Sequence, residues 1–515
     1  MWHPSSIRTI CWIRYMVLIL ACTAAQALHA VPRGDLTLQV TDLDSGKPIP
    51  IRMHLHDQRN RSIKPPKLVG NKHYFVFDRE ITLSLKPGQY SFQMERGPEY
   101  RRRRGSFTID RDSHDIKSLT MQRFVDMSRE GWWAGDLAIT SDTKNLELLM
   151  GAEDLHVAPA VTWDNKRVRW QQTALPQNPL VQFEGNRFMH LLAGQDSRQG
   201  GTLRFFNAKS PLETTKVTPE FPSAVTFLKQ ARDQSAHVDI GDPFSPDLPL
   251  WIASGMTHSL NICSSQLVRD LALKRSPPKP FAGVSQFPDK YGDGDWAQQV
   301  YYHLLNCGLR IPMTAGSGFG ENGNPLGNNR VYVYCGTDLT WEHWWRALQA
   351  GRTVVTNGPM LRPRINNQLP GFVFEGFAEE KFELEIGLKL SMREKVDYLE
   401  IVKNGQVIHH VMLDEYAKQQ GRLPKVEFSQ SGWLLVRAVV DNPSTYQFAS
   451  SGPYYVKIGE KPRVSRNSAQ FFLDWLFERA KQLDIEDPQQ KQSVLRYHRA
   501  ARDFWQKLLA SANAE

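Results

Sequence analysis

The spacing of hydrophobic residues changes along this chain, and these changes limit what it can fold into. From about residue 31 to 125, apolar and polar residues alternate, as at Leu36, Leu38 and Val40. Side chains two apart on a strand share a face, so this pattern predicts half-buried β-strands. Turn signals such as Asp44-Ser-Gly46 separate them. We therefore expect a β-sandwich over 31–125.

The next segment, from about 126 to 357, alternates strand-like and helix-like patterns. Residues 157–162 form a short apolar run, which indicates a buried strand. Trp296, Val300 and Leu304 recur every four residues, which predicts a helix that ends before Gly308. Helices are also expected over 145–150, 222–234 and 340–351. Repeated βα units are typical of a largely parallel sheet or a barrel.

The remaining chain returns to strands and then becomes helical. Over 358–460 the alternation resumes, and Asn404-Gly405 between apolar runs is a strong hairpin signal. We expect a second β-sandwich there. From 461 to 515 the apolar spacing is helical, and Asp487-Pro488 is a favourable start for the last helix. These helices are expected to pack back on the preceding domain.

Length and composition restrict the class of protein. With 515 residues the chain is too long for a single core, and 41% hydrophobic and 23% charged residues are ordinary for a globular protein. The formal charge of +9 is mild, and the dense basic run over 101–104 is interpreted as a solvated loop, so no nucleic-acid partner is expected. Cys263, Cys307 and Cys335 are too widely spaced for a disulfide framework and are predicted to be buried thiols.

The N-terminus has the pattern of a secretory signal over residues 1–27. Arg8 and Arg14 precede an apolar run at 16–21, and Ala25-Gln-Ala27 offers a cleavage site. This predicts export to the periplasm or the extracellular space. Ile19-Leu-Ala-Cys22 leaves a second interpretation open, a lipid anchor at Cys22. The run is too short to span a membrane, and no later segment is expected to form a transmembrane helix.

The most distinctive motif lies at residues 131–140. Gly135-Asp-Leu137, at the end of a short predicted strand, resembles the opening motif of the PHP-type (polymerase and histidinol phosphatase) metallohydrolases. In that family the motif continues His-x-His, and both imidazoles bind metal. Here Ala138 and Thr140 occupy those positions, and neither can replace an imidazole ligand. Asp136 remains a pocket candidate, because barrel enzymes place their chemistry at the carboxyl ends of strands.

Two further motifs that carry the resemblance keep polar side chains at ligand positions. In the phrase over 160–165, Trp163 and Asp164 stand where the family has Asp and a metal-binding His, and a carboxylate can also bind a divalent ion. Ala236-His-Val-Asp239 resembles the family's Ala-His-Pro motif, which makes His237 a candidate ligand. Asp239 is two residues further along a predicted strand, so both side chains are expected to face the barrel mouth. His258 follows a glycine turn and is a further pocket candidate.

Two other motifs lack their ligands or match loosely. Ala193-Gly-Gln-Asp196 resembles the family's Gly-x-Glu region, with Gln195 or Asp196 near the acidic position. In the phrase over 314–319, which resembles the closing motif, Gly318 and Gly320 replace an acid and an imidazole.

The framing phrases extend the resemblance over about 125–410. Residues 351–359 and 396–405 are similar to the end of the PHP domain and the following β-domain in the carbaryl-hydrolase-like (CehA/McbA-type) branch. Residues 44–50 and 85–90 resemble a carboxypeptidase-regulatory-like sandwich. The resemblance implies a multi-domain α/β protein: a distorted (β/α)7-type PHP barrel over 126–357, flanked by β-sandwich domains over 31–125 and 358–460, with a helical tail over 461–515.

Two functions follow from the resemblance and stay open at this point. One is a divergent metal-dependent hydrolase of the ester or phosphoester type, which would hold zinc or manganese weakly through Asp164, His237 and Asp239. The other is a non-catalytic binding or structural protein on the same scaffold, with no metal. A small-molecule or glycan ligand fits either function. The sequence does not indicate the substrate or the oligomeric state.

Overall fold

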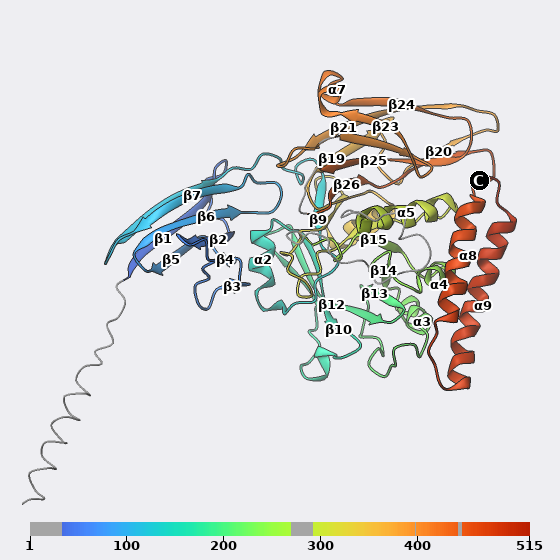
Figure 1. Cartoon of the computed structure of the whole chain (residues 1–515), viewed down its shortest axis with the longest axis horizontal. Coiled ribbons are helices and arrows are strands. Elements are labelled where there is room, and N and C mark those ends of the chain that lie inside the picture. Colours follow the sequence, from blue (N-terminus) through green and yellow to red (C-terminus); the bar gives the residue numbers. More distant parts are fainter. Residues whose placement is uncertain (1–32, 269–291, 397, 441–444) are drawn as a thin grey trace, which may run out of the picture.

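The computed structural model describes residues 33–268, 292–396, 398–440 and 445–515 (Figure 1). The predicted signal peptide and the lipidation site at Cys22 lie outside these residues. Within these ranges, the helices are all too short or too polar to cross a membrane. Cys263, Cys307 and Cys335 are free and buried, as predicted.

The N-terminal part is built from two sheets that enclose one core. One sheet has the order β5-β1-β8 and the other the order β3-β4-β2-β6-β7. Burial along β1 alternates residue by residue, which confirms the predicted period of two. The inward face carries Leu36, Leu38 and Val40, which are at most 1% exposed. The strands are β1 (Gly34–Asp42), β2 (Ile51–Asp57), β3 (Val69–Gly70), β4 (Phe75–Phe77), β5 (Glu80–Leu85), β6 (Gly88–Glu95), β7 (Arg103–Ile109) and β8 (His114–Met121).

The central part contains a long mixed sheet with the order β16-β15-β14-β13-β12-β10-β9-β17-β18, which continues into the C-terminal strands. The prediction of a largely parallel sheet holds only in part, because β13 is antiparallel to both β12 and β14. Arg198 pairs with Gly201 in a tight hairpin, and a connection that short can join only antiparallel strands. The strands are β9 (Trp132–Gly135), β10 (Val157–Trp163), β11 (Leu180–Phe183), β12 (Arg187–Arg198), β13 (Gly201–Phe206), β14 (His237–Ile240), β15 (Ser259–Cys263), β16 (Met313–Ala315), β17 (Arg330–Tyr334) and β18 (Thr353–Thr356).

Beyond β9, the chain forms hydrogen bonds to the chain at the end of β16. The Leu137 amide donates to the Ala315 carbonyl at 3.1 Å, and the Phe319 amide donates to the Ala138 carbonyl at 3.0 Å. The Thr140 amide then donates to the Phe319 carbonyl at 2.9 Å. Because β9 and β16 lie far apart in the strand order, these bonds show that the sheet curls back on itself.

The central part contains the helices η1 (Thr143–Asn145), α2 (Leu146–Ala152), η2 (Arg169–Gln171), α3 (Val225–Asp233), α4 (Leu248–Ala253), α5 (Gly292–Asn306) and α6 (Trp341–Gln349). Helices α2, α3, α5 and α6 lie where the periodicity predicts them, within a few residues at each end, whereas η1, η2 and α4 were not predicted. Gly308 has a φ of 74° just after α5, as expected for a helix end. On α6, the Trp344 indole donates to the Trp133 carbonyl at 3.2 Å, and the Trp345 ring lies 4.9 Å from His237. One helix therefore packs against both β9 and β14.

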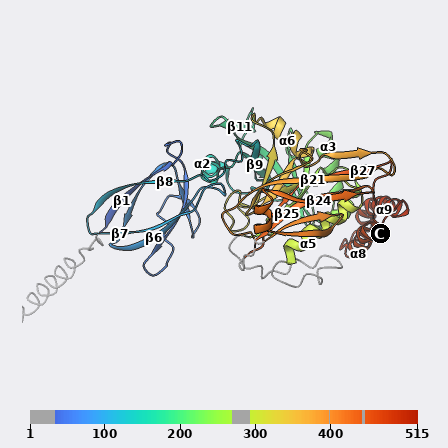
Figure 2. The same cartoon turned by 90° about the horizontal axis from the view of Figure 1, so that it is seen from above.

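The C-terminal strands extend the long sheet and add a second one above it (Figures 1 and 2). Strand β18 pairs with β26, which leads to β25, β22 and β23, while β19, β21 and β24 form a separate sheet. Asn404 and Gly405 have φ values of 50° and 85°, so the predicted hairpin is confirmed. The strands are β19 (Met360–Ile365), β20 (Val373–Gly376), β21 (Phe382–Ser391), β22 (Tyr398–Lys403), β23 (Gln406–Met412), β24 (Arg422–Phe428), β25 (Gly432–Val440), β26 (Gln447–Ser451) and β27 (Tyr454–Ile458), with α7 (Leu413–Lys418) between β23 and β24.

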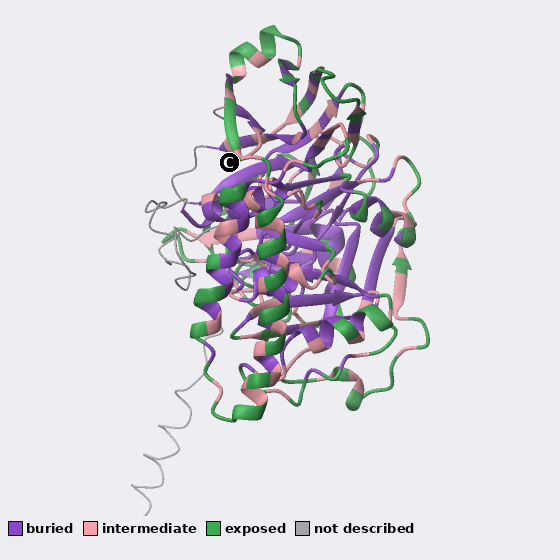
Figure 3. Ribbon diagram, turned by 90° about the vertical axis from the view of Figure 1, so that its right-hand side faces the viewer, coloured by how far each residue is buried: buried purple, intermediate pink, exposed green. Residues whose placement is uncertain are grey.

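The last two helices, α8 (Arg466–Lys481) and α9 (Pro488–Ala510), pack back on the central part, as predicted. The Trp475 indole donates to the Pro246 carbonyl at 3.1 Å, and the Trp505 indole donates to the Pro249 carbonyl at 3.0 Å. Arg479 pairs with Asp247 at 2.7 Å. Figure 3 shows the result: these helices carry buried residues toward the sheet and exposed residues on the outside.

A buried ion network joins the N-terminal sandwich to the central part. Arg123 pairs with Glu99 at 3.0 Å and with Asp154 at 2.6 Å, and Arg187 pairs with Asp154 at 2.8 Å. Burial, with the nearby Asp154 charge, raises the pKa of Glu99 to about 7. Asp154 is also fully buried, but the Arg123, Arg96 and Arg187 charges outweigh its burial and hold its pKa well below the usual range.

The substitution Trp505→Ala is expected to lower the stability of the helical tail by about 3–5 kcal/mol, because it removes a fully buried ring and leaves a cavity. Trp505 is 0% exposed and stacks on Phe472 at 4.8 Å. Denaturant unfolding followed by circular dichroism measures this loss. Lys507→Ala, at an exposed position on the same helix, is the control and should change stability little. Equal effects of the two substitutions would contradict the packing described for α9.

Candidate functional site

Asp136, which follows β9 directly, is fully buried and satisfied by the protein itself. Its Oδ1 accepts the Ala138 amide at 3.0 Å and the Ser317 amide at 2.9 Å. Its Oδ2 accepts the Gly327 amide at 2.8 Å and the Ser317 hydroxyl. The side chain is 0% exposed, and burial raises its pKa. This carboxylate therefore ties the end of β9 to the loop after β16.

The positions that correspond to the missing histidines are packed closely. Ala138 is 0% exposed, and a Cβ atom added to Gly316 would lie 2.4 Å from the Ala138 Cβ. The Thr140 hydroxyl donates to the Phe319 carbonyl at 3.3 Å. Gly320 has a φ of 102°, and a Cβ there would lie 2.6 Å from the Ser141 amide nitrogen. A side chain at position 320 would need the backbone to move, and Ala138 is buried in close contact with Gly316.

Trp163, at the position of the family's Asp, fills the core instead of facing solvent. It is 0% exposed and stacks on Phe205 with ring centroids 5.6 Å apart. A Cβ on Gly194 would lie 2.0 Å from a Trp163 ring atom, so only glycine fits under this ring. The glycine of the phrase over 193–196 is thus explained by packing.

His237 and Asp239 both contact the Ser259 hydroxyl inside the sheet. The His237 Nε2 lies 2.8 Å from the Ser259 Oγ, and this hydroxyl donates to the Asp239 Oδ1 at 2.6 Å. The Thr314 hydroxyl donates to the same oxygen at 2.6 Å. Both predicted residues are buried, at 2% and 0% exposure. Burial raises the pKa of Asp239 to about 6, and it holds the pKa of His237 well below 6.5.

The direction of these hydrogen bonds excludes a serine nucleophile. In a Ser-His-Asp triad the hydroxyl donates to the imidazole, and the imidazole donates to the carboxylate. Here Ser259 donates to Asp239, so the His237 Nε2 must carry the proton. The Gln349 amide nitrogen, 3.4 Å from the His237 Nδ1, is consistent with this tautomer. These side chains form a buried hydrogen-bonded group with a structural role, and Ser259 is not activated as a nucleophile.

His237 lies at the start of its strand. Strand β14 begins at His237, because Ala236 still belongs to the turn that closes α3. At this end of the strand the imidazole packs among aromatic rings, with Trp345 at 4.9 Å and Phe206 at 6.3 Å. His258 is exposed, its ring lies 5.2 Å from that of His237, and its Nδ1 accepts the Val238 amide at 2.9 Å.

The Asp164 carboxylate accepts hydrogen bonds within a turn after β10. Its Oδ1 accepts the amides of Lys166 at 2.7 Å and Arg167 at 2.9 Å. Asp196, the alternative acid, accepts the Asn165 amide group at 2.7 Å and pairs with Arg198 at 2.7 Å. Across the described ranges, no group of three or more His, Cys, Asp and Glu side chains is placed to hold a metal ion.

Ser259 and Thr314 were missed by the motif search, although they complete the environment of Asp239. The strand register brings them there, since Asp239 is the direct partner of Ser259, and β16 is the next strand. Thr314 lies between Met313 and Ala315 as the polar residue of β16, which is a local signal, whereas β15 carries Asn261 as well as Ser259 and does not single out the serine. The opposite oxygen of Asp239, Oδ2, has no hydrogen-bond partner within the described part of the chain.

Comparisons with known proteins give only weak likenesses. No family model and no curated protein matches the chain. A pilus-presented adhesin shares 18% identity over 18% of this chain and 28% of its own, with a TM-score of 0.14. β-Glucuronidases from Parabacteroides merdae and Bacteroides uniformis share 12% and 9% identity, with TM-scores of 0.17, over 81% and 82% of this chain and 61% of their own. The chain thus spans less than two thirds of each of these proteins, and such TM-scores carry no argument about function.

The substitution His237→Gln is expected to make the protein less sensitive to acid. The native imidazole stays neutral because burial holds its pKa well below 6.5, whereas the unfolded chain takes up a proton near pH 6.5. This contribution to stability is present above pH 6.5 and is lost as the pH falls. Removing it should reduce the loss of stability below pH 6.5 by up to about 1.4 kcal/mol per pH unit. Denaturant unfolding at pH 7, 6 and 5 measures this slope.

His343→Gln, on α6, is the matched control for this measurement, because His343 is not fully buried. Its slope should equal that of the unaltered protein. A His237→Gln slope that also equals it would show that His237 takes up its proton in the folded state.

Proposed function

We propose that this protein is an exported, non-catalytic binding or structural protein on a PHP-like scaffold. The observation that carries the proposal is that the Asp136 carboxylate is buried and already hydrogen-bonded within the protein. Both of its oxygens accept hydrogen bonds from the protein's own backbone and from Ser317, and its side chain is 0% exposed. In a PHP-type hydrolase this end of the strand faces the metal centre. Here the same carboxylate holds two loops together.

The strand order supports the PHP-like scaffold. Strands β9, β10, β12, β13, β14, β15 and β16 follow one another in the sheet, and the Leu137–Ala315 hydrogen bond links its two ends. A distorted (β/α)7-type barrel would have this path. The distortion would come from β13, which runs antiparallel to its neighbours and is joined to β12 without a helix.

The ligand positions favour the non-catalytic alternative over the divergent hydrolase. A hydrolytic site needs several imidazoles and carboxylates that converge on an ion at about 2.0–2.2 Å. Asp164 caps a surface turn, and His237 is enclosed by aromatic rings at the start of β14. Asp239 already accepts two hydroxyl hydrogen bonds on one oxygen. Among the described residues, no third His, Cys, Asp or Glu joins His237 and Asp239 in a position to hold an ion.

Metal analysis of the purified mature protein tests this proposal. We expect less than one zinc or manganese ion per chain, and no turnover of phosphoester or carboxylic ester substrates when either metal is added. The physical reason is the number of remaining ligands, since each missing ligand leaves more of the coordination to water. Two or more tightly held ions per chain, with a turnover that a chelator abolishes, would establish the hydrolase alternative.

The substitution Asp136→Ala separates a structural carboxylate from a ligand. We expect it to lower stability by at least about 2 kcal/mol, because it leaves buried N–H groups without acceptors. The metal content should not change. Thermal unfolding and elemental analysis of the same samples give both results. Asp142→Ala, which removes a cap at the exposed 3-10 helix, is the control and should cost at most about 1 kcal/mol. Loss of bound metal without loss of stability would contradict the proposal.

A further inference from the structure

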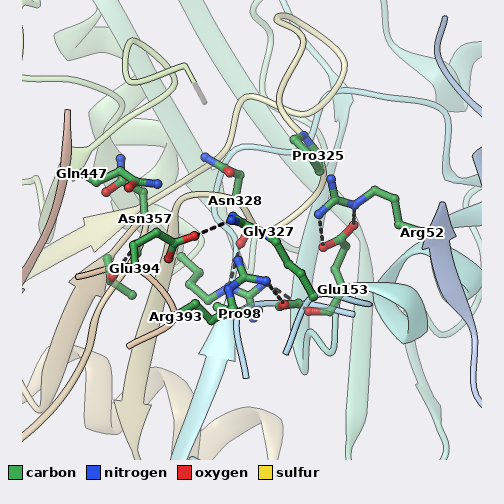
Figure 4. Close-up of a pocket in the computed structure, with 15 residues that line it drawn as sticks. Arg52, Pro98, Glu153, Pro325, Gly327, Asn328, Asn357, Arg393, Glu394 and Gln447 are labelled. Carbon is green, nitrogen blue, oxygen red and sulfur yellow. Dashed lines mark hydrogen bonds and ion pairs between the residues drawn. The ribbon is translucent and has the colours of Figure 1, made fainter. Parts of the chain in front are cut away.

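A cleft opens where the N-terminal sandwich, the central sheet and the C-terminal strands meet (Figure 4). Arg52 of β2, Glu153 after α2, Asn357 after β18 and Glu394 after β21 all line it. Its cavity volume is about 30 Å³. One water needs about 10–15 Å³ by this measure, so the cleft accommodates a group larger than a single water.

Two arginines in the wall of the cleft are almost completely buried. Arg52 is 3% exposed and Arg330 is 1% exposed. Glu153 holds both in place: its carboxylate pairs with the Arg52 Nε at 2.6 Å, and its backbone carbonyl accepts the Arg330 Nη2 at 3.0 Å. The Nη1 atom of each guanidinium has no hydrogen-bond partner within the described ranges. Each arginine therefore keeps one buried donor to offer.

Two further arginines line the more open part of the cleft. Arg102 pairs with Glu394 at 2.6 Å, and Arg393 donates to the Gly97 carbonyl at 3.1 Å. Their side chains are 26% and 16% exposed. The basic run that contains Arg102 is not simply the solvated loop that its composition predicts, because Arg103 begins β7 and Arg102 lines this cleft.

Positive charge is in excess on the lining. The lining carries four arginines, Arg52, Arg102, Arg330 and Arg393, and the carboxylates of Glu153 and Glu394. The buried Glu95 behind it pairs with Arg52 at 2.8 Å and lies 3.4 Å from Arg102 and 4.0 Å from Arg393, so four positive charges face three negative ones. A guanidinium group does not lose its proton in proteins, so this charge cannot be relieved by titration. A buried donor that lacks an acceptor destabilises the fold, and more so when it is charged. An anion with several acceptor oxygens would balance the excess positive charge and accept hydrogen bonds from the unpaired guanidinium donors.

Two amide side chains at the cleft, Asn357 and Asn328, already form hydrogen bonds within the protein and are not the donors expected to bind an anion. Asn357 donates to the Tyr446 carbonyl at 2.8 Å and accepts the Phe448 amide at 2.9 Å. Asn328 donates to the Asn329 side chain at 2.9 Å. These groups are used within the protein, so the guanidinium groups are the donors that select a ligand.

We propose that this cleft binds a compact oxyanion, a phosphate, sulfate or carboxylate group, through Arg52 and Arg330 with Arg102 and Arg393 at the rim. Planar guanidinium groups recognise such anions by paired hydrogen bonds. The proposal does not depend on whether the barrel interior retains a metal, since none of these four arginines belongs to the candidate metal site. The cleft is not one of the sites that the motif resemblance indicates.

Calorimetric titration of the full mature chain with sodium phosphate, sodium sulfate and sodium acetate tests the proposal, with sodium chloride holding the ionic strength constant. We expect saturable binding of at least one anion with a Kd of about 1 mM or lower, which corresponds to a binding free energy of about −4 kcal/mol or more negative. The anion that binds most tightly identifies the group, and the others should compete with it. Absence of saturable binding for all three anions would overturn the proposal.

Variants locate the site. Arg330→Met should weaken binding at least tenfold, and the double substitution Arg102→Gln with Arg393→Gln gives a second test that leaves the buried arginines in place. Arg104→Gln removes an exposed arginine that bonds to Gln93 outside the cleft, and it is the matched control. Unchanged affinity in the folded double variant would place the anion elsewhere and overturn the proposal.

Glu394→Gln gives a test with the opposite sign. It removes a negative charge from the lining while it keeps the size of the side chain, so anion binding should become several-fold tighter. A purely structural role for the arginines predicts no such gain. Weaker or unchanged binding in this variant would contradict an electrostatic anion site at the cleft.

Discussion

The placement of the N-terminal sandwich depends on one buried ion network. Arg123 binds both Glu99 and Asp154, and Asp154 also binds Arg187, which starts β12. Tyr332, on β17, adds a hydrogen bond to Glu99 at 2.9 Å. Removing one partner from a buried ion pair leaves an uncompensated charge and costs several kcal/mol. The sandwich is therefore held at a defined position against the sheet, and the walls of the cleft are defined with it.

Parts of the fold follow from local patterns, while the buried polar groups depend on contacts between distant residues. The alternation along β1 and the Asn404-Gly405 turn are readable because neighbouring residues determine them. The pairing of Arg52 with Glu153 joins residues 101 positions apart, and no local pattern indicates it. The Ser259 contact of Asp239 likewise depends on strand register.

Asp136 and Asp239, two buried carboxylates at motif positions, are held by the protein's own donors, but to different degrees. Asp136 has donors on both oxygens, whereas Asp239 has hydroxyl donors on Oδ1 alone. Burial raises the pKa of both, and for Asp239 the value of about 6 shows how weakly the two hydroxyls offset desolvation. Of the two, Asp239 retains the capacity to accept one more donor, and the charge of Arg204, its register partner on β13, opposes the effect of burial on its pKa.

Gly327 connects the interior of the sheet to the cleft. Its amide donates to the Asp136 Oδ2 at 2.8 Å, and its carbonyl accepts the Arg330 Nε at 2.7 Å. The loop after β16, which in a PHP-type hydrolase would present the last metal ligands, is thus held between a buried carboxylate and a buried arginine. Because the same guanidinium group keeps Nη1 without a hydrogen-bond partner among the described residues, the bonds that close the interior also leave a charged donor at the junction. The proposed absence of a metal site and the proposed anion site would then share a single structural cause.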